Sequence, residues 1–87
     1  MANRVVVTIC GEDYTFVAEE SIAYTQRVAS YVDEKMNEVL NSIKVGRTDA
    51  AILTAANITD ELFKAQAEVS DLKREIFRLQ QKLDKKA

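Results

Sequence analysis

Several residue types are missing or scarce in this 87-residue chain, and each shortage narrows the choice of function. It has no histidine and a single cysteine, Cys10, so we expect no transition-metal site and no intramolecular disulfide. A lone thiol fits a reducing compartment. No apolar stretch approaches the roughly 20 residues that a transmembrane helix needs, and the N-terminal apolar run is too short for a signal-peptide core. These shortages predict a cytoplasmic protein that does not insert into membranes.

The chain also lacks the residue arrangements of an enzyme. It has no recognisable nucleophile–base pair and no phosphate-binding loop. The best carboxylate pairs are Asp33 with Glu34 and Asp60 with Glu61, but adjacent helical residues point about 100° apart and cannot share one substrate. Cys10 could be a reactive thiol, yet no histidine exists to activate it, and a small apolar strand residue is the favoured interpretation. We therefore predict no catalytic activity and no cofactor.

Charge is unevenly distributed along the second half of the chain. Residues 49–71 hold five acidic residues and one lysine, whereas residues 72–87 hold six basic and two acidic residues. An acidic start and a basic finish suit the dipole of one long helix. No basic face is large enough to neutralise several phosphates, and the region before the heptads is acidic where a basic-region zipper carries arginines. Nucleic-acid binding is not expected.

The first segment has the pattern of a β-hairpin. In "RVVVTIC", residues 4–10, β-branched residues dominate and two faces alternate, which predicts a strand. "GED", residues 11–13, supplies turn chemistry, and "YTFVA" follows with Tyr14 and Phe16 on one face. A lone two-stranded hairpin is barely stable in water. It must therefore pack on a helix or be continued by the strands of a partner.

Two helices are predicted after the hairpin, and no proline interrupts them. Residues 19–44 form an amphipathic helix, because apolar residues recur there at three- and four-residue steps. "KVGRTD", residues 44–49, breaks this pattern, with Gly46 in a turn and Thr48 or Asp49 as the next N-cap. A second helix then runs to the C-terminus. The sequence predicts an α+β fold, with a globular head (residues 1–48) of one hairpin and one helix, followed by a long coiled-coil helix (residues 49–87).

The long helix carries four heptads without a slip. An apolar residue stands at every a and d position, which is a strong coiled-coil signal, and β-branched a residues with leucine at d favour a parallel pair. In this register Glu68 faces Lys73 of a partner helix. The a positions are Ala55, Leu62, Val69, Ile76 and Leu83, and the d positions are Ile58, Ala65, Leu72 and Leu79.

Two phenylalanines lie outside this seam. Phe63 and Phe77 both fall at b, and burial of a phenylalanine is worth about 1.5–3 kcal/mol, which favours a second covered surface. Antiparallel packing of two coiled coils would cover Phe77 and would set the acidic half beside the basic half. The alternative is that these rings are solvent-exposed. The expected assembly is a dimer or a dimer of dimers, with Phe77 and the seam residues from Leu62 to Leu83 in the oligomer contacts.

Three stretches together resemble the ZapA family of bacterial cell-division proteins. They are a strand that ends in "ICGEDY", a helix that carries "VASYVDEKMNEV" and a second helix that begins "LTAANITDEL". The resemblance covers essentially the whole chain, although the family usually has a larger residue where this chain has Ala56. Its most specific positions are Gly11, Tyr14, Ala29, Val32, Asp33, Met36, Thr54, Ala55, Asn57, Ile58, Asp60 and Glu61.

The resemblance implies a non-enzymatic protein that binds FtsZ, the tubulin-like GTPase of the division ring, and promotes assembly, bundling and cross-linking of its filaments at mid-cell. It also implies dimers with intertwined hairpin domains that associate through their C-terminal helices. Since those apolar faces are committed to assembly, the candidate filament contacts are basic residues of the head, namely Arg27, Lys35, Lys44 and Arg47. The heptads alone would equally suit a generic cytoplasmic coiled-coil adaptor or a chaperone-like subunit. Co-sedimentation with polymerised FtsZ distinguishes these two functions.

Overall fold

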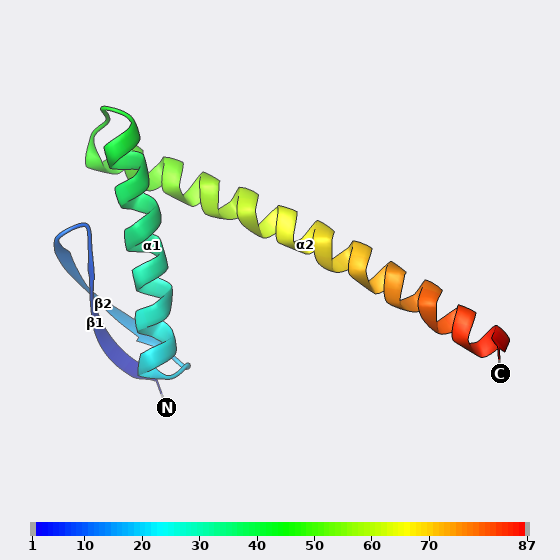
Figure 1. The fold of residues 1–87 in the computed structure, drawn as a ribbon. Helices are drawn as coiled ribbons and strands as arrows, with labels where there is room; N and C mark the ends of the chain where they lie inside the picture. The colour runs from blue at the N-terminus through cyan, green and yellow to red at the C-terminus, as the bar shows by residue number, and fades with distance from the viewer. Residues whose placement is uncertain (1, 87) are drawn as a thin grey trace. The chain divides into compact units, whose positions relative to one another are not determined.

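The computed structural model describes residues 2–86 and contains a two-stranded antiparallel hairpin, one helix packed on it and one long helix (Figure 1). This confirms the α+β organisation predicted from the sequence. The chain forms two compact units, Met1–Asn57 and Ile58–Ala87, so about the first three turns of the long helix belong to the first unit. From here on, the head is the first of these units, Met1–Asn57, and the tail is the second, Ile58–Ala87. The elements are β1 (Asn3–Ile9), β2 (Glu12–Ala18), α1 (Ile22–Ser42) and α2 (Arg47–Lys86).

The hairpin turn is shorter than the sequence suggested. Ile9 pairs with Glu12, which leaves only Cys10 and Gly11 in the turn, and their φ angles are 49° and 82°. Two left-handed residues define the primed turn whose twist matches that of the flanking strands. The prediction that Cys10 is a strand residue is therefore wrong, as is the inclusion of Glu12 and Asp13 in the turn, because strand alternation alone does not show where the chain reverses.

The core of the head lies between one face of the hairpin and α1. Val5, Val7 and Ile9 alternate along β1 and are all buried. The strand register sets Phe16 opposite Val5, so that its half-buried ring adds to the same layer. Helical spacing brings the apolar side chains of α1 to the opposing surface, and the first turn of α2 closes one side of the core. The buried apolar residues from the two helices are Ala29, Met36, Val39 and Ala50.

Side-chain capping explains where α1 begins. The hydroxyl of Ser21 accepts a hydrogen bond from the N–H of Tyr24 at 3.1 Å, and the Ser21 carbonyl accepts one from the N–H of Thr25 at 3.0 Å. Ser21 is thus the N-cap, and α1 starts at Ile22 instead of residue 19. The cap fixes the N-terminal end of the helix against the hairpin.

The start of α2 differs from the prediction. The Ala50 N–H donates to the Gly46 carbonyl at 2.9 Å, and the helix begins at Arg47, two residues before the predicted start. The expected N-cap at Thr48 or Asp49 is wrong, because both residues lie inside the first turn, where the charge of Asp49 suits the helix dipole. One turn further along, the hydroxyl of the buried residue Thr54 donates a hydrogen bond to the Ala50 carbonyl at 2.7 Å. This early start makes Arg47 the first helical residue.

Among residues 2–86, no helix combines the length and the apolar character needed to cross a membrane. None of the described residues in the tail part of α2 is buried. Its helix carries ion pairs between Lys64 and Asp60 at 2.8 Å, and between neighbouring charges one turn apart, Arg74 with Asp71 and Arg78 with Glu75. Such exposed pairs contribute little to stability, because water and salt screen them. They support the helix without giving it a core.

Candidate protein–protein interfaces

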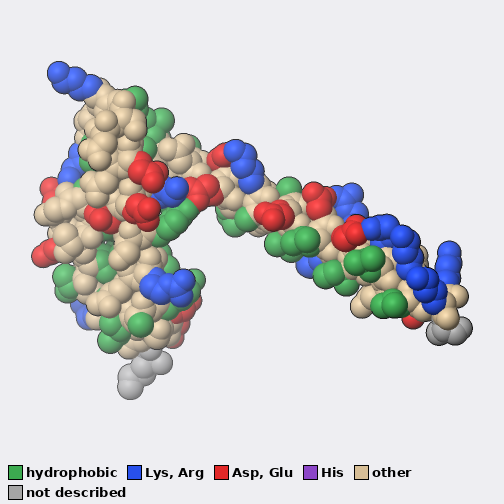
Figure 2. Space-filling model, viewed as in Figure 1, with side chains coloured by type: hydrophobic (Ala, Val, Ile, Leu, Met, Phe, Trp, Pro, Cys, Tyr) green, Lys and Arg blue, Asp and Glu red, His purple; other side chains and the backbone are tan. Residues whose placement is uncertain are grey.

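The tail presents a continuous apolar stripe to solvent. Figure 2 shows hydrophobic side chains gathered on one side of the long helix, with lysines and arginines grouped toward its C-terminal end. The side chains of the stripe are between 46% and 68% exposed, and each occupies an a or d position of the heptads. They are Leu62 (50%), Val69 (49%), Leu72 (55%), Ile76 (55%), Leu79 (46%) and Leu83 (68%).

This stripe is energetically incomplete in a single protomer. Helices in proteins gain most of their stability from packing an amphipathic face, and each large aliphatic side chain that becomes buried contributes about 1.5–3 kcal/mol. Glu68 and Lys73, predicted to face each other between two chains, make no ion pair among the described residues of one chain. The stripe and these two charges suit a second helix laid alongside.

Phe63 and Phe77 are also exposed, at 64% and 62%. They lie one position after the seam, so a helix that covered the stripe would leave part of each ring accessible. Contiguous exposed apolar surface of this kind marks an interaction site more often than a free surface. The geometry gives Phe77 a position suited to a contact beyond a two-helix seam.

The head has uncovered apolar surface as well. Tyr24, Val28 and Tyr31 recur at four- and three-residue steps on one face of α1 and are 40–52% exposed. A separate groove of about 440 Å³ lies between the hairpin, α1 and the first turns of α2, with Phe16 and Met36 among its lining residues. A head of this size buries little surface alone, and partner contacts would complete it.

The four basic residues predicted to contact a partner are spread over the head: Arg27 and Lys35 lie on α1, Lys44 precedes α2 and Arg47 begins it. Arg27 on α1 and Lys44 before α2 are exposed and make no ion pair within the described chain. Lys35 is paired with Glu38 at 3.6 Å, and its ammonium lies 5.3 Å from the centre of the Tyr31 ring. Arg47 is used differently from all three.

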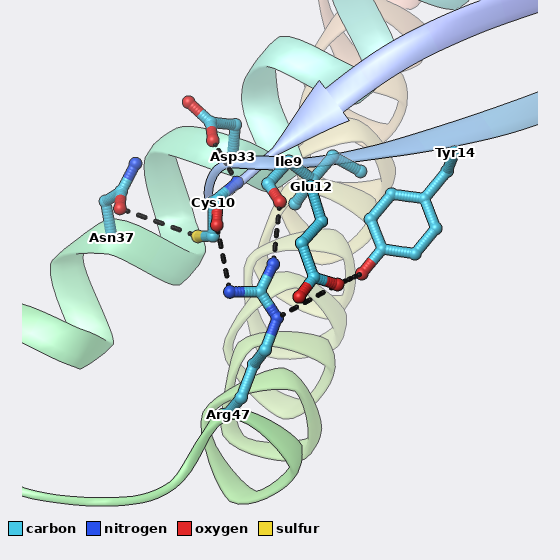
Figure 3. Close-up of polar contacts among 7 residues, drawn as sticks. All are labelled: Ile9, Cys10, Glu12, Tyr14, Asp33, Asn37 and Arg47. Carbon is cyan, nitrogen blue, oxygen red and sulfur yellow. Dashed lines mark hydrogen bonds and ion pairs between the residues drawn. The ribbon is translucent and has the colours of Figure 1, made fainter.

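Arg47 binds the turn of the hairpin (Figure 3). Its Nη1 donates to the Cys10 carbonyl and its Nη2 to the Ile9 carbonyl, both at 2.9 Å. From the other side, Asp33 Oδ1 accepts the Cys10 N–H at 2.7 Å. The thiol of Cys10 also lies 3.5 Å from the side-chain oxygen of Asn37. Three segments far apart in the sequence therefore meet at the backbone of one turn.

Two further side chains hold the guanidinium. Glu12 lies 3.6 Å from Nε of Arg47, and the Tyr14 hydroxyl donates to the same carboxylate oxygen at 3.1 Å. Proximity to the Tyr14 phenol and, after it, to the Glu12 carboxylate raises the pKa of Arg47. Sequence patterns did not reveal this network. A turn of Asn-Gly would have indicated the primed geometry, whereas Cys-Gly does not.

Comparison with known proteins agrees with the fold. The family described as "Cell division protein ZapA" matches residues 5–87. The chain is 43% identical to the ZapA of Geobacillus kaustophilus, with 85% of this chain and 82% of the relative covered. It is 34% identical to the ZapA of Bacillus subtilis, with 85% and 88% covered.

Two solved structures are similar. One is a ZapA mutant dimer from Geobacillus stearothermophilus, with a TM-score of 0.67, 36% identity, and 87% of this chain and 90% of that chain covered. The other is a conserved bacterial protein of unknown function from Pseudomonas aeruginosa PAO1, with a TM-score of 0.65, 28% identity, and 95% and 98% covered. The sequence match over nearly the whole chain and the shared fold lead to one conclusion: the chain belongs to the ZapA family of cell-division proteins.

Proposed function

We propose that this protein is a non-enzymatic, cytoplasmic cross-linker that binds FtsZ at the mid-cell division site and promotes assembly and bundling of its filaments. The observation that carries the proposal is the uncovered apolar stripe of the tail, in a chain that belongs to a cell-division family. A rod that pairs with a copy of itself joins two heads. Two heads on one rod can hold two sites on filaments.

The proposed assembly is a homodimer, with a further association of dimers into a tetramer. Support for the dimer comes from the a and d residues of the tail, all partly or largely exposed, and from the similar G. stearothermophilus structure, which is a dimer of a ZapA mutant. Support for the second step comes from Phe77, which lies beside the seam. When two heads are joined by one rod, binding of the first head to a filament makes the binding of the second head intramolecular. The overall avidity can then exceed the affinity of one head by factors of about 10²–10⁴.

Thermal unfolding should depend on protein concentration. If the head and tail complete their cores only in the dimer, folding and association are one event, and mass action raises the midpoint as concentration rises. Differential scanning fluorimetry or circular dichroism over a hundredfold concentration range measures this. A constant midpoint, together with a monomeric mass in analytical ultracentrifugation, would contradict the proposed dimer.

The filament contact is proposed on basic residues of the head, where Arg27 and Lys44 make no ion pair within the described chain and Lys35, also on α1, pairs with Glu38. The double variant Arg27→Glu with Lys44→Glu should weaken co-sedimentation with polymerised FtsZ by roughly tenfold, because each change reverses a charge offered to an acidic partner.

Arg4→Glu is the matched control, since it reverses an exposed charge on the hairpin and should leave pelleting unchanged. If wild-type protein fails to pellet with the polymer while it remains dimeric, the chain is a coiled-coil adaptor or chaperone-like subunit for another partner. Equal loss in both variants would show that only general charge matters.

A further inference from the structure

The turn of the hairpin holds its backbone in an unfavourable conformation. Gly11 tolerates a φ of 82°, but Cys10 adopts a φ of 49°, which side-chain-bearing residues other than Asn and Asp rarely do. A cysteine cannot make the local side-chain bond by which Asn and Asp favour this conformation. The turn therefore depends on contacts from outside the hairpin.

We propose that Arg47 and Asp33 lock the Cys10–Gly11 turn from opposite sides, and that Arg47 is a positioning residue that fixes the hairpin to the first turn of α2. The Asp33 carboxylate accepts a hydrogen bond from the backbone N–H of Cys10. The Arg47 guanidinium donates to the backbone carbonyls of Ile9 and Cys10. Hydrogen bonds that involve a charged group are stronger than those between neutral groups. The planar guanidinium of Arg47 also fixes the positions of both carbonyls relative to each other.

The lock also determines the wall of the groove in the head. Ile9, Glu12 and Arg47 all line the groove of about 440 Å³, and Glu12 and Tyr14 orient the guanidinium that binds the turn. Release of Arg47 would free the turn and displace one side of this groove at the same time. The inference concerns the folded head and does not rest on the proposed binding of FtsZ.

Hydrogen exchange of the full-length protein, followed by NMR, tests the lock. The Cys10 amide is the direct reporter, because its acceptor is Asp33. Arg47→Gln should speed exchange of the amides of residues 10–12 by about tenfold, and Arg47→Lys should restore little of the protection, because an ammonium cannot span two carbonyls as a fork does. Arg27→Gln, which removes an exposed unpaired charge, should not change this exchange.

A rescue experiment separates this role from a filament contact. Asparagine favours a left-handed residue before glycine, so Cys10→Asn should slow exchange in the Arg47→Gln background. Unchanged exchange in Arg47→Gln would overturn the proposal. So would a loss of pelleting in Arg47→Gln that Arg47→Lys restores without a change in exchange.

Discussion

Replacing Ile76 with aspartate should dissociate the tail of the proposed dimer. The residue stands at an a position near the middle of the stripe, where the same side chain from each protomer would enter one dry layer. The variant loses two apolar side chains per dimer and brings two carboxylates together in that layer. The free energy of association should therefore weaken by roughly 3–5 kcal/mol or more. The association constant should fall by at least about 100-fold. Circular dichroism should show loss of helix from the last three heptads.

Gln81→Asp is the matched control for this experiment. It places the same charge in the same part of the helix, but at an f position, on the face opposite the seam. It should remain dimeric with wild-type helicity. An Ile76→Asp protein of unchanged mass and helicity would show that the heptad register assigned to the tail is wrong.

Phe77→Glu should abolish most filament bundling while it leaves filament binding intact. The ring is 62% exposed and lies outside the seam, so the change costs the two-helix contact little. In a tetramer it would place four like charges at the contact between dimers. We expect a species with the mass of a dimer in sedimentation that still pellets with FtsZ polymer but bundles it poorly, because one step of avidity has been removed.

Phe77→Leu is the comparison that makes the result of Phe77→Glu interpretable. It keeps an apolar side chain at the same position and should bundle nearly as well as wild type. A Phe77→Glu protein that stays tetrameric would show that this ring is ordinary surface. A dimeric variant that bundles at the wild-type level would show that one dimer already bridges two filaments.

Much of the fold follows from local periodicity. The alternation of Val5, Val7 and Ile9 predicted a strand with one buried face, and the structure buries all three. The unbroken heptads predicted a single long helix, and α2 runs from Arg47 to Lys86. These patterns are reliable because each repeats over many residues, and a repeated apolar face must be covered by something.

Features set by single tertiary contacts could not be read in the same way. Arg47 was predicted to be one of the filament contacts of the head, and its role at the hairpin turn was not foreseen. Its hydrogen bond to the Cys10 carbonyl spans 37 positions in the sequence, and no local pattern records such a contact. Cys10 looked like the end of a strand because its neighbours alternate, whereas the strand register makes it the first turn residue. Whether Arg27, Lys35 or Lys44 contacts a filament depends on the surface of a partner, which one chain does not encode.

The lack of burial in the tail of a single protomer affects the amount of this protein in a cell. A protomer without a partner has no buried residue in the tail, so we expect that segment to open readily and to be cut by proteases. Pairing removes the same backbone from attack, because it stabilises the folded form by mass action. Degradation would then act on the unassembled protein, and the cellular level of free protomer would be set by turnover as well as by synthesis. Variants with a weakened stripe should therefore have a shorter half-life in vivo, even when their heads are intact.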